Sequence, residues 1–464
     1  MRSRSPDRLK RLHWPLRFVV DSRVDSCRRR SGYRLMPVRP SRDFLQMISS
    51  AMLGQALLSA GNFFVGLLLI HRAPHAQYGY YVLIITAVQL LAQAQLAFIQ
   101  PSLVRCLTGS DRATRREFVG GAYREQRRWV LFAAGAAGLL VLGLWYLNVL
   151  DKSAALTVFA AIFAALATLY REYFRMVLLA YRIPLKAFQV DVFYVLLLCG
   201  GVYAATLGDT PAMTAALALG VAAVVGGWLL SGMVRRHEGW VIDGAPHILK
   251  EMAPFGTWAV TGAAIHWTFA QGFIYIVAGT LGVNAVAAVS ATRLLLMPVN
   301  LMSFGLGSMT FPTVSKWLKH HSVSDVFKRL SLLAAGIAVL GALYEIVMWF
   351  SRDWIFMHMT KGQFEHRDTL LILWSAVFLL MGVRDQMLFL PAACGRYRIM
   401  AWLTLATAIF SLVTCYVCMR MFGVVGALVG VLSGEAFNIL GFIALSLREI
   451  ALARRGESVP EPAT

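Results

Sequence analysis

The chain has 464 residues, of which 58% are hydrophobic and only 15% charged, and its mean hydropathy is +0.62. Soluble domains are nearer half apolar and a quarter charged, so this composition excludes a soluble globular protein. Apolar runs long enough to cross a bilayer as helices follow one another almost from end to end. The alternating segments of an outer-membrane barrel are missing from the sequence. Composition therefore predicts an all-α integral membrane protein.

The apolar runs predict about 12 transmembrane helices in two six-helix bundles. The expected helices lie at about 44–70, 80–104, 129–150, 154–178, 188–207, 212–234, 255–280, 284–310, 329–350, 370–392, 400–420 and 424–447. The longest polar break between them, residues 235–254, is expected to be a cytoplasmic linker. This division gives a basic cytoplasmic segment (1–43), an N-terminal bundle (44–234), the linker, a C-terminal bundle (255–447) and a cytoplasmic tail (448–464).

The first 35 residues are rich in arginine and contain no long apolar run. One interpretation is a basic tail held at anionic lipid headgroups. The other is that the true translation start is Met36, which shortly precedes the first apolar run. The residues support both interpretations equally.

The net charge of +20 comes from short basic segments between apolar runs, which is typical of a membrane protein and argues against nucleic-acid binding. With the N-terminus inside, cytoplasmic segments carry 36 Lys and Arg and outer segments carry 6. The bias is still 23 to 6 without the first 43 residues. Because basic residues stay on the cytoplasmic side, both termini are expected to be cytoplasmic.

No motif in the sequence indicates catalysis, a cofactor or a metal. Phosphate-binding, zinc-protease and serine-hydrolase signatures are missing, so the protein is not expected to be an enzyme. Cys415 and Cys418 have CxxC spacing inside an apolar run and are expected to pack in the core. Glycines at 426, 430 and 434 recur every four positions, which favours close helix packing within the bundle over dimerisation.

Polar groups inside the predicted helices are the candidates for function, because an ionised side chain at bilayer depth costs about 3 kcal/mol and must face a wet cavity or a partner. The candidates for a substrate-binding cavity are Arg293, Arg384, His266, Gln271, Gln89 and Gln93. Glu345, Asp385 and Glu435 are candidates for charge coupling or for structural pairing. Arg384 could pair with Glu345 or Glu435, whereas its sequence neighbour Asp385 points about 100° away on a helix. Gln89 and Gln93 are expected to share a surface because they are four residues apart.

Three stretches resemble the polysaccharide-transport flippases of the MATE-like exporter superfamily. Residues 73–105 resemble the first loop and second helix of that family, and 170–193 resemble its basic junction between helices four and five. Residues 279–316, with the pattern LG…AVA…SA.R…P…P, resemble its helix eight and place Arg293 at the arginine of the pattern. The resemblance extends over most of 44–447, and its motifs are mainly structural.

The resemblance implies a flippase that moves a polyprenyl-pyrophosphate-linked oligosaccharide across the bacterial inner membrane for synthesis of surface polysaccharide such as O-antigen. Its partners would then be membrane lipids, a polysaccharide polymerase and glycosyltransferases. The alternative is a cation-coupled multidrug exporter of the same fold, which usually holds an acidic residue in its first bundle. The first three predicted helices contain none, so the sequence favours the lipid-linked substrate. A non-transport scaffold would not need buried arginines.

The basic asymmetry yields a testable orientation. Topology reporters fused within 151–153 and 351–369 are expected to be active only outside the membrane, and fusions within 235–252 only inside, because basic segments are retained in the cytoplasm. Paired alkaline phosphatase and fluorescent protein fusions measure the two sides independently. A reversed pattern would contradict the orientation.

Overall fold

A computed structural model describes residues 42–109, 111–239, 246–360 and 366–455. The chain forms two compact units, Met1–Gln46 and Met47–Thr464, and the description below concerns the second. The basic N-terminal segment with its Met36 alternative lies outside the described residues, as does the end of the C-terminal tail. Every regular element in the described ranges is a helix, which confirms the predicted fold class.

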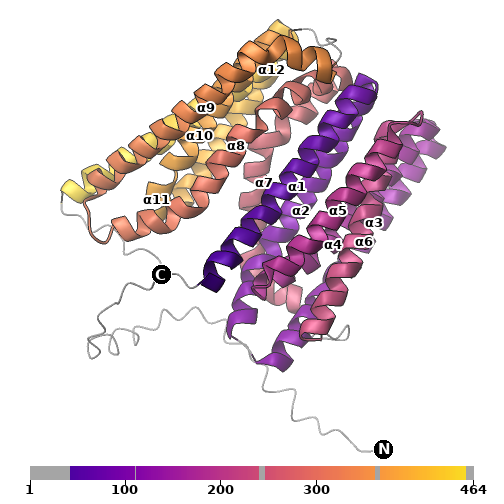
Figure 1. Cartoon of the computed structure of the whole chain (residues 1–464), viewed down its shortest axis with the longest axis horizontal. Helices are drawn as coiled ribbons and strands as arrows, with labels where there is room; N and C mark the ends of the chain where they lie inside the picture. Colours follow the sequence, from indigo (N-terminus) through magenta and orange to yellow (C-terminus); the bar gives the residue numbers. More distant parts are fainter. Residues whose placement is uncertain (1–41, 110, 240–245, 361–365, 456–464) are drawn as a thin grey trace, which may run out of the picture. The chain divides into compact units, whose positions relative to one another are not determined.

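The helices follow one another with short connections (Figure 1). Their bounds are α1 Arg42–Arg72, α2 His75–Gly109, α3 Arg112–Tyr146, α4 Lys152–Ala180, α5 Pro184–Ala205, α6 Pro211–His237, α7 Ile248–Leu281, α8 Val283–Trp317, α9 Val323–Thr360, α10 Arg367–Met387, α11 Phe389–Ala393 and α12 Tyr397–Arg454. Eleven segments of the described chain are long and apolar enough to cross a membrane.

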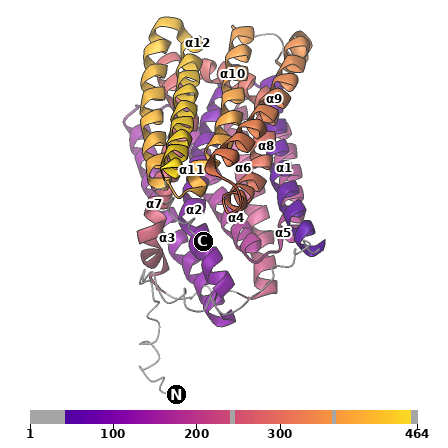
Figure 2. The ribbon, with the colours of Figure 1, turned by 90° about the vertical axis from the view of Figure 1, so that its left-hand side faces the viewer.

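The last of these segments, α12, contains two crossings. At 58 residues it would be about 87 Å long if straight, whereas a bilayer core is about 30 Å thick. Gly423 breaks it with a φ of 57°, a value that glycine adopts without the steric cost of a side chain. The two arms then lie side by side (Figure 2). They correspond to the eleventh and twelfth predicted helices.

The glycine stripe of α12 is the surface on which these two arms meet. A Cβ on Gly430 would lie 2.2 Å from the Cα of Cys415, and one on Gly426 would lie 2.1 Å from the carbonyl oxygen of Cys418. A Cβ on Gly434 would lie 2.5 Å from Ser411. The stripe therefore packs within one hairpin, as the sequence predicts, and Cys415 is fully buried in that contact.

Several helices extend further than hydropathy predicts, and α3 differs most. It begins at Arg112 and not near 129, because the basic stretch before the apolar run is itself helical. Phe118, Val119 and Ala122 form a buried stripe along that stretch, although its other residues are mostly charged. A hydropathy scan finds only the apolar part of such a helix. Glu117 and Glu125 therefore belong to α3, so the expectation of no acidic residue in the third helix is wrong.

Charged side chains of α3 bind the end of α6 and the start of α7. The Glu125 carboxylate accepts hydrogen bonds from the backbone N–H groups of His247 and Leu249, the latter at 2.9 Å, and so caps the α7 N-terminus. Arg115 donates from Nε to Glu238 at 2.8 Å. Burial, together with a hydrogen bond to Glu238, raises the pKa of Tyr181, so this phenol is neutral at physiological pH. The end of α6 at Glu238 and the start of α7 at His247 are thus both bound to α3.

Helix α2 contacts helices from both halves of the second unit, where the first half means α1 to α6 and the second half α7 to α12. It contacts α4 and α6 of the first half and also α7 and α8 of the second half. Tyr275 of α7 donates a hydrogen bond to the Leu83 carbonyl at 3.1 Å. A Cβ on Gly79 would lie 2.2 Å from the carbonyl oxygen of Val283, so the start of α8 lies directly against α2. Side chains along α2 therefore face helices of both halves.

The hairpin contact predicts a specific stability effect. Gly430→Ala is expected to destabilise the protein by about 1–3 kcal/mol, because the new methyl group must push two backbones apart. The matched control is Gly336→Ala in α9, where a Cβ would meet nothing within 4 Å. Thermal unfolding of both purified variants in detergent measures the difference. Equal unfolding temperatures would show that the two arms are not tightly packed at Gly430.

Candidate functional site

Arg293 lies inside the apolar part of α8, at the wall of a cavity of about 140 Å³. It donates a hydrogen bond from Nη1 to Gln271 Oε1 of α7 at 2.6 Å. Its guanidinium carbon lies 5.3 Å from the ring centroid of Trp374, and the Trp374 indole donates to the Val289 carbonyl at 3.0 Å. The α8 backbone and a buried tryptophan thus hold the guanidinium plane in position.

The charge of Arg293 has no ion-pair partner in the described part of the chain. An amide oxygen and an aromatic face stabilise a guanidinium without cancelling its charge. The remaining polar lining of this "Arg293 cavity" is also uncharged: Asn62, Tyr78, Tyr81, Thr86, Gln89 and Ser290. Arg293 is therefore the charged residue in the wall of this cavity, and its positive charge can attract an anionic ligand.

A second cavity, of about 230 Å³, lies between α1, α2, α4 and α5. We call it the glutamine cavity, because its polar wall contains Gln55, Gln89, Gln93 and Gln95, together with Asn62. The side chains of Gln55, Asn62, Gln89 and Gln93 are exposed although they lie on membrane-spanning helices. Gln89 and Gln93 share this wall, as their four-residue spacing predicts.

Arg171, Glu172 and Arg175 line the glutamine cavity and form a network of four charges with Asp191. Arg171 of α4 pairs with its neighbour Glu172 and with Asp191 of α5. Arg175 donates from Nε to Asp191 Oδ2 at 3.0 Å and lies 3.8 Å from Glu172 Oε2. The Arg171 guanidinium also stacks 3.7 Å from the centroid of the Tyr194 ring. Two cations face two anions, so this network is neutral as a whole.

This network was not identified from the sequence, because Arg171 and Arg175 were counted among the basic residues of the cytoplasmic side although both lie within the predicted helix 154–178. Helix α4 continues to Ala180, and Arg171 is only 2% exposed. The signal was present in the four-residue spacing of the two arginines on an otherwise apolar helix face, with Asp191 soon after Pro184. Counting these arginines among loop charges slightly overstated the basic asymmetry.

The two cavities adjoin each other. Asn62, Ile85 and Gln89 line both of them. Gln271 and Arg293 lie at the far end of the Arg293 cavity, and Gln93 lies in the glutamine cavity. The polar residues shared by the two cavities, Asn62 and Gln89, therefore lie between the charge network and Arg293.

Arg384 is in a different situation from Arg293. It donates from Nη1 to both carboxylate oxygens of Glu435, at 2.8 and 2.7 Å, and from Nη2 to Asp385 at 2.8 Å. The structure thus selects Glu435 from the two partners left open by the sequence. It also brings Asp385 onto the guanidinium, because the long arginine side chain bends back along its own helix. Two acids compensate Arg384, which leaves no free charge for a substrate.

The remaining candidates lie outside both cavities. His266 is exposed on α7 and near enough to Arg384 and Asp385 to interact with their charges. Glu345 of α9 is 7% exposed, and its Oε1 has no hydrogen-bond partner among the described residues. The structure thus brings together Arg293, Gln271, Gln89 and Gln93 along one surface. The Arg384 cluster lines neither cavity, although its Glu435 is near enough to Arg293 to interact with its charge.

Solved structures with the same arrangement of helices are membrane transporters. A multidrug resistance MATE family transporter of the MOP superfamily, in an inward-facing conformation, matches with a TM-score of 0.70 and 14% identity, covering 87% of this chain and 99% of that one. The lipid II flippase MurJ, in an inward closed conformation, matches with a TM-score of 0.67 and 9% identity over 89% and 91% of the two chains. A eukaryotic MATE transporter matches with a TM-score of 0.58 and 12% identity over 89% and 99%.

The fold is MATE-like. No protein-family model matches the sequence, and no curated protein matches it. At these identities the likeness concerns the fold, and the MATE-like fold is shared by multidrug transporters and a lipid flippase. The fold therefore does not determine the substrate, which depends on the side chains that line the two cavities.

The charge network predicts a large effect of a single neutralisation. Asp191→Asn is expected to destabilise the protein by about 3–5 kcal/mol, because it leaves buried arginine charge uncompensated. The matched control is Asp353→Asn, since Asp353 pairs with Arg367 but is 67% exposed, and surface pairs contribute about 0–1 kcal/mol. Membrane abundance and the unfolding temperature in detergent measure both. If Asp191→Asn were as stable as the control, the network would not be a structural unit.

Proposed function

We propose that the protein is a flippase that moves a polyprenyl-pyrophosphate-linked oligosaccharide from the inner to the outer leaflet of a bacterial inner membrane, for surface polysaccharide synthesis. The observation that carries the proposal is Arg293, a guanidinium that has no ion-pair partner among the described residues and lies at the wall of a cavity in a MATE-like fold. Guanidinium groups present a planar fork of donors that matches phosphate oxygens. A lipid flippase among the proteins of this fold supports a lipid-bearing substrate.

Membrane voltage favours this direction of transport. With the cell interior negative, outward movement of a negative charge gains about 2.3 kcal/mol per 100 mV. A pyrophosphate with about two negative charges would gain roughly twice that amount per 100 mV. Such a flippase needs no ATPase domain, and the sequence contains no nucleotide-binding motif.

A cation-coupled multidrug exporter is the competing proposal, because proteins of this fold include multidrug transporters. The two acids of the charge network argue against it. Asp191 and Glu172 are both engaged by Arg171 and Arg175, so neither is free to take up a proton or a sodium ion without breaking ion pairs. A cavity whose one uncompensated charge is positive is also poorly suited to cationic drugs.

The proposed function predicts the phenotype of an Arg293 variant. Arg293→Ala is expected to abolish surface glycan while the protein inserts at normal levels, because Gln271 and Trp374 can pack without the guanidinium. Arg293→Lys is expected to restore only part of the export, since an ammonium keeps the charge but lacks the fork of donors and the stacking on Trp374. Surface glycan and protein abundance are measured in the same cells.

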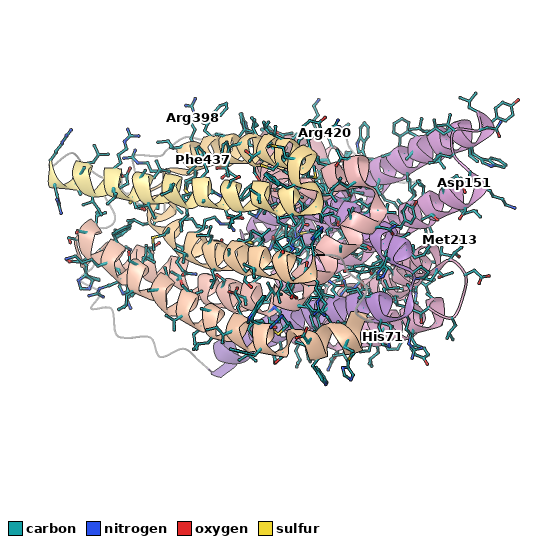
Figure 3. The ribbon with its side chains drawn as sticks, turned by 90° about the horizontal axis from the view of Figure 1, so that it is seen from above. His71, Asp151, Met213, Arg398, Arg420 and Phe437 are labelled. Carbon is teal, nitrogen blue, oxygen red and sulfur yellow. The ribbon has the colours of Figure 1, made fainter. Side chains whose placement is uncertain are left out.

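The matched control is Arg420→Ala, because Arg420, labelled on α12 in Figure 3, is exposed and, within the described chain, hydrogen-bonds to Tyr416 of its own helix. It is expected to export normally. Wild-type export by a well-expressed Arg293→Ala protein would refute the proposed role of Arg293. Loss of the protein itself would assign Arg293 a structural role.

A further inference from the structure

The proposed function assigns the phosphate to Arg293 and leaves the glutamine cavity without a role. The charged groups of the two cavities also differ. Its four charged groups compensate each other, whereas Arg293 has no ion-pair partner in the described chain. A net anion therefore gains more at Arg293 than at the glutamine cavity. The two cavities are suited to different parts of a ligand.

The exposed polar side chains in the wall of the glutamine cavity are carboxamides, and they lie among apolar residues such as Leu58 and Leu96. Gln55, Gln89, Gln93 and Asn62 each offer a carbonyl acceptor and an NH₂ donor pair. A hydroxyl group both donates and accepts, so a ligand dense in hydroxyls can pair with several such amides at once. An apolar ligand would leave these groups unpaired and lose free energy for each one. The wall therefore favours an uncharged, hydroxyl-rich group over a drug-like apolar one.

The position of the cavity sets which part of the substrate it receives. Asn62 and Gln89 line both cavities, so a group in the glutamine cavity lies directly beside a group held by Arg293. In a glycan attached to a lipid through a diphosphate, the first sugar residues are the hydroxyl-rich groups nearest to the phosphates. The two neighbouring cavities correspond to these two neighbouring parts.

We infer that the glutamine cavity is a subsite for the uncharged sugar next to the diphosphate, separate from the Arg293 subsite for the diphosphate itself. The inference rests on the proposed function and adds the place where the sugar binds and the expectation that the first sugar is uncharged. The protein would then select lipid diphosphates that carry a neutral, hydroxyl-rich first sugar. It would discriminate against diphosphates without a sugar.

The test is a binding measurement on the purified full-length protein in lipid nanodiscs. Two fluorescent probes are used, a polyprenyl diphosphate without sugar and the same lipid carrying one neutral hexose. The wild type is expected to bind the hexose-bearing probe about tenfold more tightly, the effect of two hydrogen bonds of ordinary net strength. Equal affinity for the two probes would overturn the subsite, and this comparison requires no variant.

Variants then locate the sugar contact. The double variant Gln55→Leu/Gln93→Leu changes residues that line only the glutamine cavity, and it is expected to lose the tenfold preference while binding the sugar-free probe as the wild type does. The matched control is Gln100→Leu, an exposed glutamine of α2 that lines neither cavity, and it is expected to keep the preference. Equal weakening of both probes by the double variant would overturn the inference.

Arg293→Ala separates this inference from the proposed function. It is expected to weaken both probes, because both carry the diphosphate. If Arg293→Ala bound both probes as the wild type does, the proposed function would fail, and the subsite with it. If Arg293→Ala weakened both probes but the wild type showed no preference for the hexose, the flippase proposal would stand and the sugar subsite would be refuted.

Discussion

Ionised side chains in the membrane-spanning helices need compensation, and this constraint organises the polar interior of the protein. A charge at bilayer depth is stable only beside an opposite charge, a strong set of dipoles or water. Arg171 and Arg175 satisfy the constraint with Asp191 and Glu172, and Arg384 satisfies it with Glu435 and Asp385. Arg293 satisfies it with an amide oxygen and an aromatic ring, which leave its charge uncancelled. The ion-paired arginines therefore hold helices together, whereas we propose that Arg293 binds the substrate.

The compensated clusters lie in separate halves, and each joins helices of its own half. The Arg171 network joins α4 to α5, and the Arg384 cluster joins α10 to the second arm of α12. Buried ion pairs of this kind stabilise a bundle less than they specify which helices meet, because desolvation offsets most of the Coulomb attraction. Arg293 lies on α8, which packs against α2 of the first half, so the uncompensated charge lies where the halves meet.

The sequence predicts the helices well because a membrane-spanning helix is marked by its apolar composition. The eleven long apolar segments of the described chain overlap the predicted runs. Polar residues are easily recognised within apolar helices, so the sequence also identifies Arg293 as a charged residue inside a helix. It predicts that Gln89 and Gln93 share a surface from their four-residue spacing. It did not predict the Arg171 network, because these arginines lie close to a helix end and resemble loop charges. The pairing of Arg384 with Glu435 depends on packing between residues 51 positions apart, which periodicity does not encode.

Helix α2 lines both cavities and also contacts the start of α8. One face of α2 lines both cavities through Gln89, and its first turn lies against the start of α8 at Gly79 and Val283. Tyr78, next to Gly79, lines the Arg293 cavity. The closest contacts at Gly79 are made by the Val283 backbone, with the Val283 Cβ also nearby. An opening of the Arg293 cavity at this end would have to part α2 from α8 there. A ligand held between Arg293 on α8 and the amides of α2 would then contact both of the moving surfaces, so its binding energy would depend on their separation.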